Sequence, residues 1–338
     1  MKQRYSELDA IRGIAVLMVA LFHYSVRYGQ IYGYSVEPEF SFNLGEYGVQ
    51  LFFIISGFVI YLTLDKTAHA VDFVVARFSR LYPAYWFAVI ITFAVVYSFH
   101  LSGREVDIQS ALLNLTMIQK WLRVGNVDGV YWTLAVELSF YVVMYFLFIT
   151  KQIKRIDFIS AVWLFIIIIS RFLEENHIIQ IHWAIKLLLL LDYGNLFIAG
   201  IMFYKIMHKG SFFNYMMLLI SLVSEYYLYG KLVLLIAIYL FLFFLFAKGY
   251  LKILSFKPLI YLGTISYSLY LIHQNIGYVI IRELQSHDMT NPVSIIVVPL
   301  VVSATLAALM QKYIEKPSLT LIRDKWRESS LRKHLINE

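Results

Sequence analysis

The sequence predicts an all-α membrane protein: a single bundle of about ten transmembrane helices with both termini in the cytoplasm. Of its 338 residues, 60% are apolar and 15% are charged, whereas a soluble domain averages about 45–50% apolar and about 25% charged residues. So few charges cannot form the polar surface that a soluble fold needs. The composition therefore excludes an ordinary cytosolic enzyme, a disordered regulator and a soluble nucleic-acid binder.

Ten apolar segments have the length of a membrane-crossing helix, and most hold about 17–22 residues. They are 8–26, 46–64, 83–100, 131–149, 157–173, 186–207, 212–229, 231–247, 259–281 and 293–314. The segment 186–207 is the least regular, because Lys186, Asp192 and Gly194 interrupt it, and its helix could begin at Tyr193. We expect one membrane domain over 1–338, with a helical core over 8–314 and a short basic cytoplasmic tail over 318–338.

The distribution of Lys and Arg predicts the orientation of these spans. With the N-terminus in the cytoplasm, the cytoplasmic segments hold 20 Lys and Arg and the outer segments hold 7. This bias follows the positive-inside rule, so the net charge of +7 indicates topology rather than a nucleic-acid partner. No small-residue cleavage site follows the first apolar run, which we interpret as a retained helix. The tail after Pro317 either lies on the anionic inner leaflet or is solvated.

Ionisable side chains inside the spans are functional candidates, because burying them in lipid is costly. Arg12 and His23 are eleven residues apart in the first span, which places both on one helix face with a rise of about 16 Å between them. Asp9 lies on the same face. The alternatives are an end charge that snorkels for Arg12 and an interhelical hydrogen bond for His23.

Glu137 and His273 lie in the outer half of their spans, at a depth similar to that of His23. A carboxylate at this depth must be protonated, paired or in a wet cavity, and a Glu–His pair can orient an imidazole base. A structural role is the alternative for both. Two histidines and one glutamate could bind zinc, but the chain has no HExxH-type spacing and no Cys, so we expect no metal.

Two arginines precede the third predicted span. Arg77 and Arg80 are at i,i+3 and face the same way, and Pro83 suits the first turn of a helix, whose free N–H groups attract anions. Two guanidinium groups beside a helix start predict a phosphate clamp on the cytoplasmic side, with ordinary positive-inside topology as the alternative. In the second span, Ser56-Gly57 favours close helix packing over backbone access by a ligand.

Six motifs together resemble the acyltransferase-3 family of bacterial integral-membrane O-acyltransferases. They are Arg12-x10-His23; Gly48-Val49-Gln50-Leu51-Phe52-Phe53 with Ser56-Gly57-Phe58; Arg77-x-x-Arg80-x-x-Pro83-x-Tyr85-Trp86; Trp132-Thr133-Leu134-x-x-Glu137-x-x-Phe140-Tyr141; Ser266-Tyr267-x-Leu269-Tyr270-x-x-His273; and Glu315-Lys316-Pro317. The resemblance implies transfer of an acyl group, usually acetyl from acetyl-CoA, to a sugar hydroxyl of a polysaccharide or glycolipid. The chain resembles the stand-alone type without a C-terminal hydrolase-like domain.

The resemblance and the placement of the residues predict one mechanism. Arg12, Arg77 and Arg80 bind acyl-CoA, His23 acts as general base or first accepts the acyl group, and Glu137 orients His23 or shares its proton. Candidate residues that line the site or stabilise the oxyanion are Ser56, Trp132, Tyr267, Ser268, Tyr270 and His273.

The expected partners are acyl-CoA, a glycan or lipid-linked saccharide acceptor and membrane lipids, with no nucleic acid; the oligomeric state stays open. A polytopic transporter of a small molecule or lipid-linked sugar is the alternative, because buried charges in a helical bundle fit one equally well. A structural scaffold for polysaccharide assembly is a third class.

Overall fold

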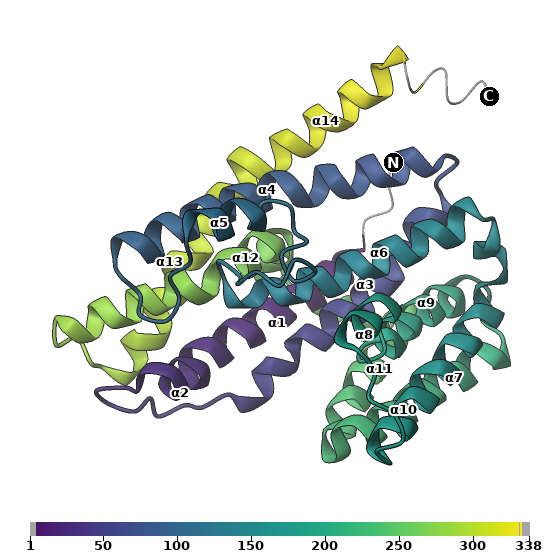
Figure 1. The fold of residues 1–338 in the computed structure, drawn as a ribbon, viewed down its shortest axis with the longest axis horizontal. Helices are drawn as coiled ribbons and strands as arrows, with labels where there is room; N and C mark the ends of the chain where they lie inside the picture. The colour runs from purple at the N-terminus through teal and green to yellow at the C-terminus, as the bar shows by residue number, and fades with distance from the viewer. Residues whose placement is uncertain (1–4, 331, 333–338) are drawn as a thin grey trace. The chain divides into compact units, whose positions relative to one another are not determined.

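The computed structural model describes residues 5–330 and 332, and this part of the chain is helical and contains no β-strand (Figure 1). Its α-helices are α1 (Ser6–Phe22), α2 (Tyr28–Tyr32), α3 (Gly48–Asp65), α4 (Ala70–Ser98), α5 (Ile108–Asn114), α6 (Trp132–Ile149), α7 (Ile156–Glu175), α8 (Trp183–Leu189), α9 (Gly194–Lys209), α10 (Phe212–Tyr229), α11 (Val233–Ala247), α12 (Lys257–Ser286), α13 (Pro292–Met310) and α14 (Lys316–Glu328). Short 3-10 segments are Asn43–Tyr47, Gly129–Tyr131, Gln152–Arg155, Gly230–Leu232 and Leu251–Leu254. Two further segments are π-helical: η1 (His23–Arg27) after α1, and η7 (Gln311–Glu315) before α14.

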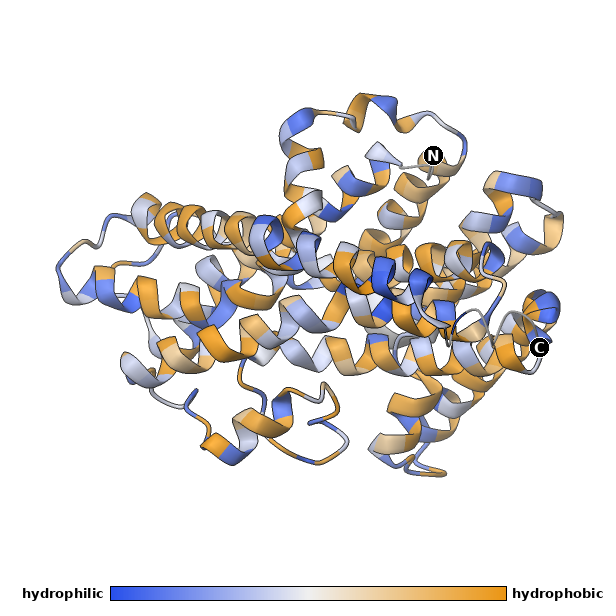
Figure 2. Cartoon of the chain, turned by 90° about the horizontal axis from the view of Figure 1, so that it is seen from above, coloured by the Kyte–Doolittle hydropathy of each residue, from blue (hydrophilic) through white to orange (hydrophobic). Residues whose placement is uncertain are grey.

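Within the described residues, seven helical stretches are long and apolar enough to cross a membrane. They are Ser6–Tyr32, Asn43–Asp65, Ala70–Ser98, Gly129–Ile149, Gln152–Glu175, Trp183–Lys209 and Pro292–Glu328, and the shorter apolar helices are Phe212–Tyr226 and Val233–Ala247. Apolar residues dominate these helices in Figure 2. The chain is therefore a multi-pass membrane protein.

The predicted spans each overlap a helix, and the polar helix α12 covers the segment 259–281. The count of about ten crossings and the cytoplasmic termini stay predictions. Lys2, Arg4 and Lys333, which contribute to the charge count, lie outside the described residues, as does the side chain of Lys231.

One predicted helix start is wrong and another is confirmed. The third span is not confined to 83–100, because α4 begins at Ala70 and Pro83 lies inside it. The prediction of a helix start at Pro83 is therefore wrong: the turns before it are already helical, and proline removes one N–H donor without ending the helix. The irregular segment 186–207 divides at Leu190, which has a left-handed backbone, and its main helix begins directly after Tyr193 as expected.

The described part of the basic tail contains most of α14, which packs against the N-terminal part of α4. Trp326 donates its indole N–H to Asp72 at 2.7 Å, and Arg332 donates to both carboxylate oxygens of Asp72 at 2.9 and 3.2 Å. These contacts do not fit a fully solvated tail, whereas the position of α14 on the inner leaflet stays a prediction. The described part of the tail is docked on α4.

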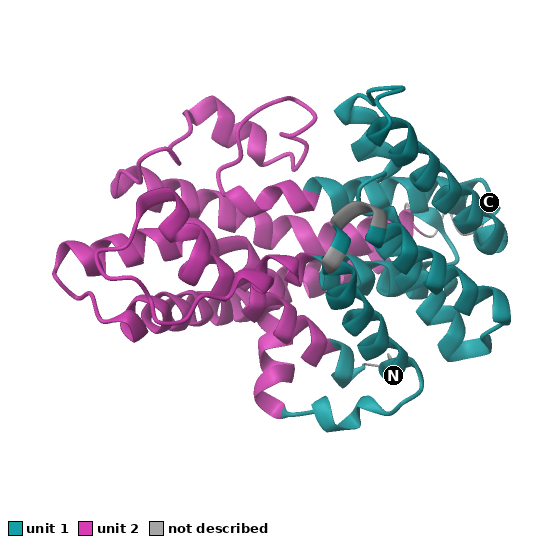
Figure 3. Cartoon of the chain, turned by 90° about the horizontal axis from the view of Figure 1, so that it is seen from below, with its two compact units in different colours: residues 1–8, 50–70, 135–256 teal, residues 9–49, 71–134, 257–338 magenta. Residues whose placement is uncertain are grey.

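The chain divides into two compact units, coloured separately in Figure 3. Unit 1 comprises residues 1–8, 50–70 and 135–256, and unit 2 comprises residues 9–49, 71–134 and 257–338. A single membrane domain over the whole chain stays a prediction.

In unit 1, α3 and α9 approach closely through a pair of glycines. A Cβ at Gly57 would overlap the Phe197 carbonyl, and a Cβ at Gly200 would overlap the Ile54 carbonyl. Backbones that touch in this way gain dispersion contacts along the whole crossing, which is how helices associate in lipid. The Ser56-Gly57 pair therefore serves close packing on its glycine side.

In unit 2, α1 and α12 make a similar crossing. A Cβ at Gly13 would overlap the Leu259 carbonyl, and a Cβ at Gly263 would overlap the Asp9 carbonyl. His23 follows α1 directly as the first residue of η1, and His273 lies in α12. The glycine crossing therefore positions the two histidine-bearing helices.

We expect Gly263→Ala to destabilise the protein by about 1–3 kcal/mol, because the added methyl group forces α12 away from the α1 backbone. Thermal unfolding in detergent measures this loss. Gly125→Ala is the matched control, since a Cβ there meets its nearest neighbour, Val106, at an ordinary 3.7 Å. Equal melting temperatures for the two variants would contradict the crossing as described.

Candidate active site

Two histidines from distant parts of the sequence meet in unit 2. His23 is the first residue of η1, and His273 lies in α12 and is fully buried. The Nε2 of His273 is 3.2 Å from the Nδ1 of His23, and the two rings stand edge to face with centroids 4.9 Å apart. π-Helical segments occur preferentially at functional sites, because they shift one side chain out of the regular helical register. We predicted a similar depth for His23 and His273, and in the structure their rings are in direct contact.

The acceptors around the pair indicate where its protons lie. The Nδ1 of His273 is 2.9 Å from the Tyr270 carbonyl and 3.2 Å from the Leu269 carbonyl, so Nδ1 donates and Nε2 is left as an acceptor. The Nδ1 of His23 faces that acceptor and also the Val19 carbonyl at 2.8 Å, so it too carries a proton. The Nε2 lone pair of His23 is then available to take a proton from a substrate.

Three side chains from two other segments, η1 and the segment 128–131, hold the α12 backbone around His273. Tyr24 donates to the His273 carbonyl at 2.7 Å, and Tyr131 donates to the Leu271 carbonyl at 3.2 Å. The fully buried Asp128 accepts from the Asn275 N–H at 3.0 Å and from the Val130 N–H at 3.1 Å. Burial raises the pKa of the Asp128 carboxyl. These bonds fix the imidazole of His273 through its own main chain.

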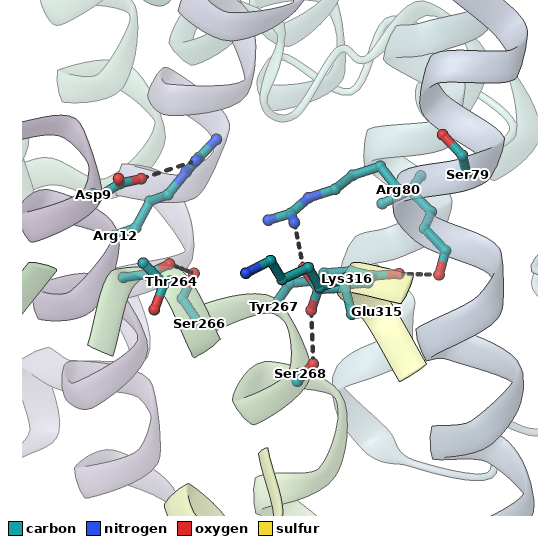
Figure 4. A network of polar contacts seen from close by, with 12 residues as sticks. Asp9, Arg12, Ser79, Arg80, Thr264, Ser266, Tyr267, Ser268, Glu315 and Lys316 are labelled. Carbon is teal, nitrogen blue, oxygen red and sulfur yellow. Dashed lines mark hydrogen bonds and ion pairs between the residues drawn. The ribbon is translucent and has the colours of Figure 1, made fainter. Parts of the chain in front are cut away.

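A second polar network of unit 2 joins α4, α12 and η7 (Figure 4). Arg80 forms an ion pair with Glu315, whose side chain is only 2% exposed, and Ser268 donates to the other carboxylate oxygen of Glu315 at 2.8 Å. The guanidinium of Arg80 also lies 5.9 Å from the ring centroid of Tyr267. Glu315 thus fixes one edge of Arg80, and the remaining N–H donors of Arg80 keep their capacity to bind an anion.

The other two predicted donor-binding arginines belong to the same unit. Arg12 pairs with Asp9 at 3.6 Å, as their spacing predicts, and its side chain reaches toward Arg80 in Figure 4. The guanidinium of Arg77 lies 5.8 Å from the ring centroid of Phe73, one turn earlier on α4. Because Pro83 is inside α4, the clamp has no helix N-terminus beside it, and its anion-binding capacity comes from the guanidinium groups alone.

Glu137 belongs to unit 1, with a different set of partners. Ser56 donates to it at 2.9 Å, and Tyr141, one turn later on α6, donates to the same carboxylate oxygen. The two hydroxyl groups thus hold one carboxylate oxygen of Glu137 in place. The predicted action of Glu137 on His23 stays a prediction.

The remaining predicted side chains also belong to unit 2. The Nζ of Lys120 lies 5.9 Å from the ring centroid of Trp132, and Tyr270 shares a 2.9 Å hydrogen bond with Thr133 beside the histidine pair. Tyr267 donates to the Leu81 carbonyl at 3.0 Å, and Ser268 donates to Glu315. Tyr267 and Ser268 therefore belong to the Arg80 network, whereas Tyr270 contacts the His273 ring at 5.7 Å between centroids.

Sequence reasoning missed the contribution of Glu315. The Glu315 side chain is buried and pairs with Arg80, a residue 235 positions away in sequence. The Glu315-Lys316-Pro317 motif was the available signal. Asp128 gave none, because it lies in a predicted outer loop.

The sequence profile of a family described as an acyltransferase domain matches residues 5–311. The chain belongs to the acyltransferase-3 family. It is 27% identical over 293 residues to ORF330 of Acidianus two-tailed virus, which is named as an acetyltransferase; the match covers 81% of this chain and 84% of the viral protein.

A second relative is the exopolysaccharide production protein ExoZ of Rhizobium meliloti, 25% identical over 174 residues, which is 50% of this chain and 53% of that protein. No solved structure matches. Membership of the family makes this chain an O-acyltransferase, and the transporter and scaffold alternatives lose their support.

Proposed function

We propose that this acyltransferase takes an acetyl group from acetyl-CoA on the cytoplasmic side and transfers it to a hydroxyl of a cell-surface polysaccharide or lipid-linked saccharide, such as O-antigen or capsule. The membrane is the bacterial cytoplasmic membrane. The observation that carries the proposal is the hydrogen-bonded pair of His23 and His273, in the same unit as the arginine network. The names of the two relatives support an acetyl donor and a saccharide acceptor.

Acetyl-CoA binding is assigned to the arginine side of unit 2. The phosphates pair with Arg77 and Arg80, with Arg12 assisting, because guanidinium groups bind phosphate oxygens through two parallel hydrogen bonds. The pantetheine arm follows the Arg12–His23 face of α1, which rises about 16 Å between the two side chains. The thioester then reaches the imidazole of His23.

His23 is proposed to act through Nε2 as the general base. It takes the proton of the acceptor hydroxyl while the hydroxyl oxygen attacks the thioester carbonyl carbon. The carbon–sulfur bond breaks, and the CoA thiolate leaves and recovers the proton from His23. His273 accepts from the Nδ1–H of His23 and so stabilises the imidazolium that forms, with its own Nδ1 anchored to main-chain carbonyls. Transfer through an acetylated His23 would use the same nitrogen.

Glu137 is proposed to share the proton of the reaction, with its carboxyl held by Ser56 and Tyr141. Tyr270, beside the histidine pair, is the proposed donor to the oxyanion. The glycan and the modified hydroxyl belong to the acceptor side, where the outer loops lie.

The test is reconstitution of the purified protein in vesicles with acetyl-labelled acetyl-CoA and a lipid-linked saccharide. We expect label on the saccharide as an alkali-labile ester, with stoichiometric release of CoA. Two results contradict the proposal. One is uptake of label without ester formation. The other is no reaction with any saccharide from a cell envelope whose O-acetylation depends on the gene. Label trapped on His23 without acceptor would replace the general-base step by an acyl-enzyme.

A further inference from the structure

The helix α14 is attached to α4 at a second point, beside the predicted phosphate clamp. Arg323 donates through Nε to the Ser79 hydroxyl at 3.2 Å and through a terminal nitrogen to the Ala76 carbonyl at 3.2 Å. Ser79 lies between Arg77 and Arg80 in sequence. Docking of α14 thus brings a third guanidinium group to the turn of α4 that already carries two.

Glu315 already pairs with Arg80, but the bonds of Arg323 go to a hydroxyl and a carbonyl, which are neutral, so the third guanidinium group adds positive charge beside the other two. Like charges a few ångströms apart repel, and most strongly where the surroundings exclude water. Docking alone does not require a cation here, because Asp72 already holds α14 through Trp326 and Arg332. A neutral amide could make the bonds to Ser79 and Ala76 without the repulsion. A guanidinium group at this position is explained by a bound polyanion.

We propose that Arg323 binds a phosphate of the acyl donor together with Arg77 and Arg80, so that α14 forms one wall of the donor site. The inference rests on the proposed function, in which the donor is acetyl-CoA. That molecule carries a diphosphate bridge and a 3′-phosphate, more charge than two guanidinium groups neutralise. Lys316, at the start of α14, extends toward the same region as Arg80 in Figure 4.

The test compares two donors that differ only in their phosphates, acetyl-CoA and acetyl-pantetheine. We expect Arg323→Gln to raise the KM for acetyl-CoA about tenfold, the effect of losing one charge-assisted contact, and to leave the KM for acetyl-pantetheine unchanged. The matched control is Arg327→Gln, one turn later on α14, because Arg327 is 61% exposed and pairs with Asp324. This control should change neither KM.

A role in helix docking alone predicts a different result, since a displaced α14 would weaken both donors equally. That outcome, or an unchanged KM for acetyl-CoA in Arg323→Gln, overturns the inference. If Arg77→Gln weakens acetyl-CoA and Arg323→Gln does not, the donor proposal stands and the inference alone fails. If the unaltered protein does not bind acetyl-CoA, both fail. If Arg323→Gln does not fold, Arg323→Lys replaces it, because lysine keeps the charge but lacks the planar fork of arginine. At high salt, we expect Arg323→Lys to raise the KM for acetyl-CoA and to leave the KM for acetyl-pantetheine unchanged.

Discussion

His23→Ala is expected to lower the rate of acetyl transfer by roughly 100- to 10,000-fold, the contribution of a positioned general base. The loss should fall on kcat, because the Nε2 atom acts on the acceptor proton in the transition state. Acetyl-CoA affinity should change little, since the predicted phosphate contacts are Arg77 and Arg80 on α4 and Arg12, which lies about 16 Å from His23 along α1. Steady-state transfer of labelled acetyl and equilibrium binding of acetyl-CoA measure the two quantities separately.

The matched control is His208→Ala. His208 makes the same local bond as His23, from its Nδ1 to the carbonyl four residues earlier, at 2.9 Å. No second histidine is bonded to it in the described part of the chain. A His23→Ala protein that folds, binds acetyl-CoA and still acetylates at the normal rate would refute the assignment.

Substitutions of His273 test whether the two histidines act together. His273→Ala should lower kcat less than His23→Ala does, and the double variant should be no slower than His23→Ala, because the two residues act as one unit. His273→Gln retains a hydrogen-bond acceptor near the position of Nε2 and should recover part of the loss. Additive effects of the two alanine substitutions would mean that His273 contributes independently of His23.

Arg80→Gln is expected to weaken acetyl-CoA binding by about 10- to 100-fold, the value of one or two charge-assisted hydrogen bonds. The same change leaves the buried carboxylate of Glu315 without its cation, which costs about 1–3 kcal/mol of stability. Titration with acetyl-CoA and thermal unfolding report these two effects.

A second substitution separates binding from folding. In Arg80→Gln/Glu315→Gln, the uncompensated charge is gone, so stability should return toward that of the unaltered protein while acetyl-CoA affinity stays low. Recovery of affinity in the double variant would mean that Arg80 serves only to neutralise Glu315. In that case the phosphate site would have to be sought elsewhere.

Local patterns made much of the fold predictable. Apolar length located the helices, and the break near Tyr193 followed from Lys186, Asp192 and Gly194. The i,i+3 spacing placed Asp9 beside Arg12. The shared face of Arg12 and His23 stays a prediction, made from the regular α-helix that α1 forms up to Phe22. Of the three side chains predicted at a similar depth, His23 and His273 are in contact.

Three features of the structure could not be predicted from local sequence patterns. A π-helical segment has no signature in a pattern with a period of 3.6 residues, so η1 could not be anticipated. Pro83 gave the wrong boundary because proline at a helix start and proline inside a membrane helix look alike in sequence. The partnership of Arg80 with Glu315 spans most of the chain, and no local rule reports it.

The glycine crossing of α1 and α12 sets a fixed length inside unit 2. Where two backbones touch at Gly13 and Gly263, neither helix can slide or turn without meeting a carbonyl of the other. The crossing thereby fixes the positions of Arg12, His23 and His273 relative to one another. Under the proposed function, a donor anchored by its phosphates then presents its thioester at a fixed distance along α1. An arm shorter than pantetheine would stop before the imidazole, and a bulkier acyl group would extend past it toward the acceptor.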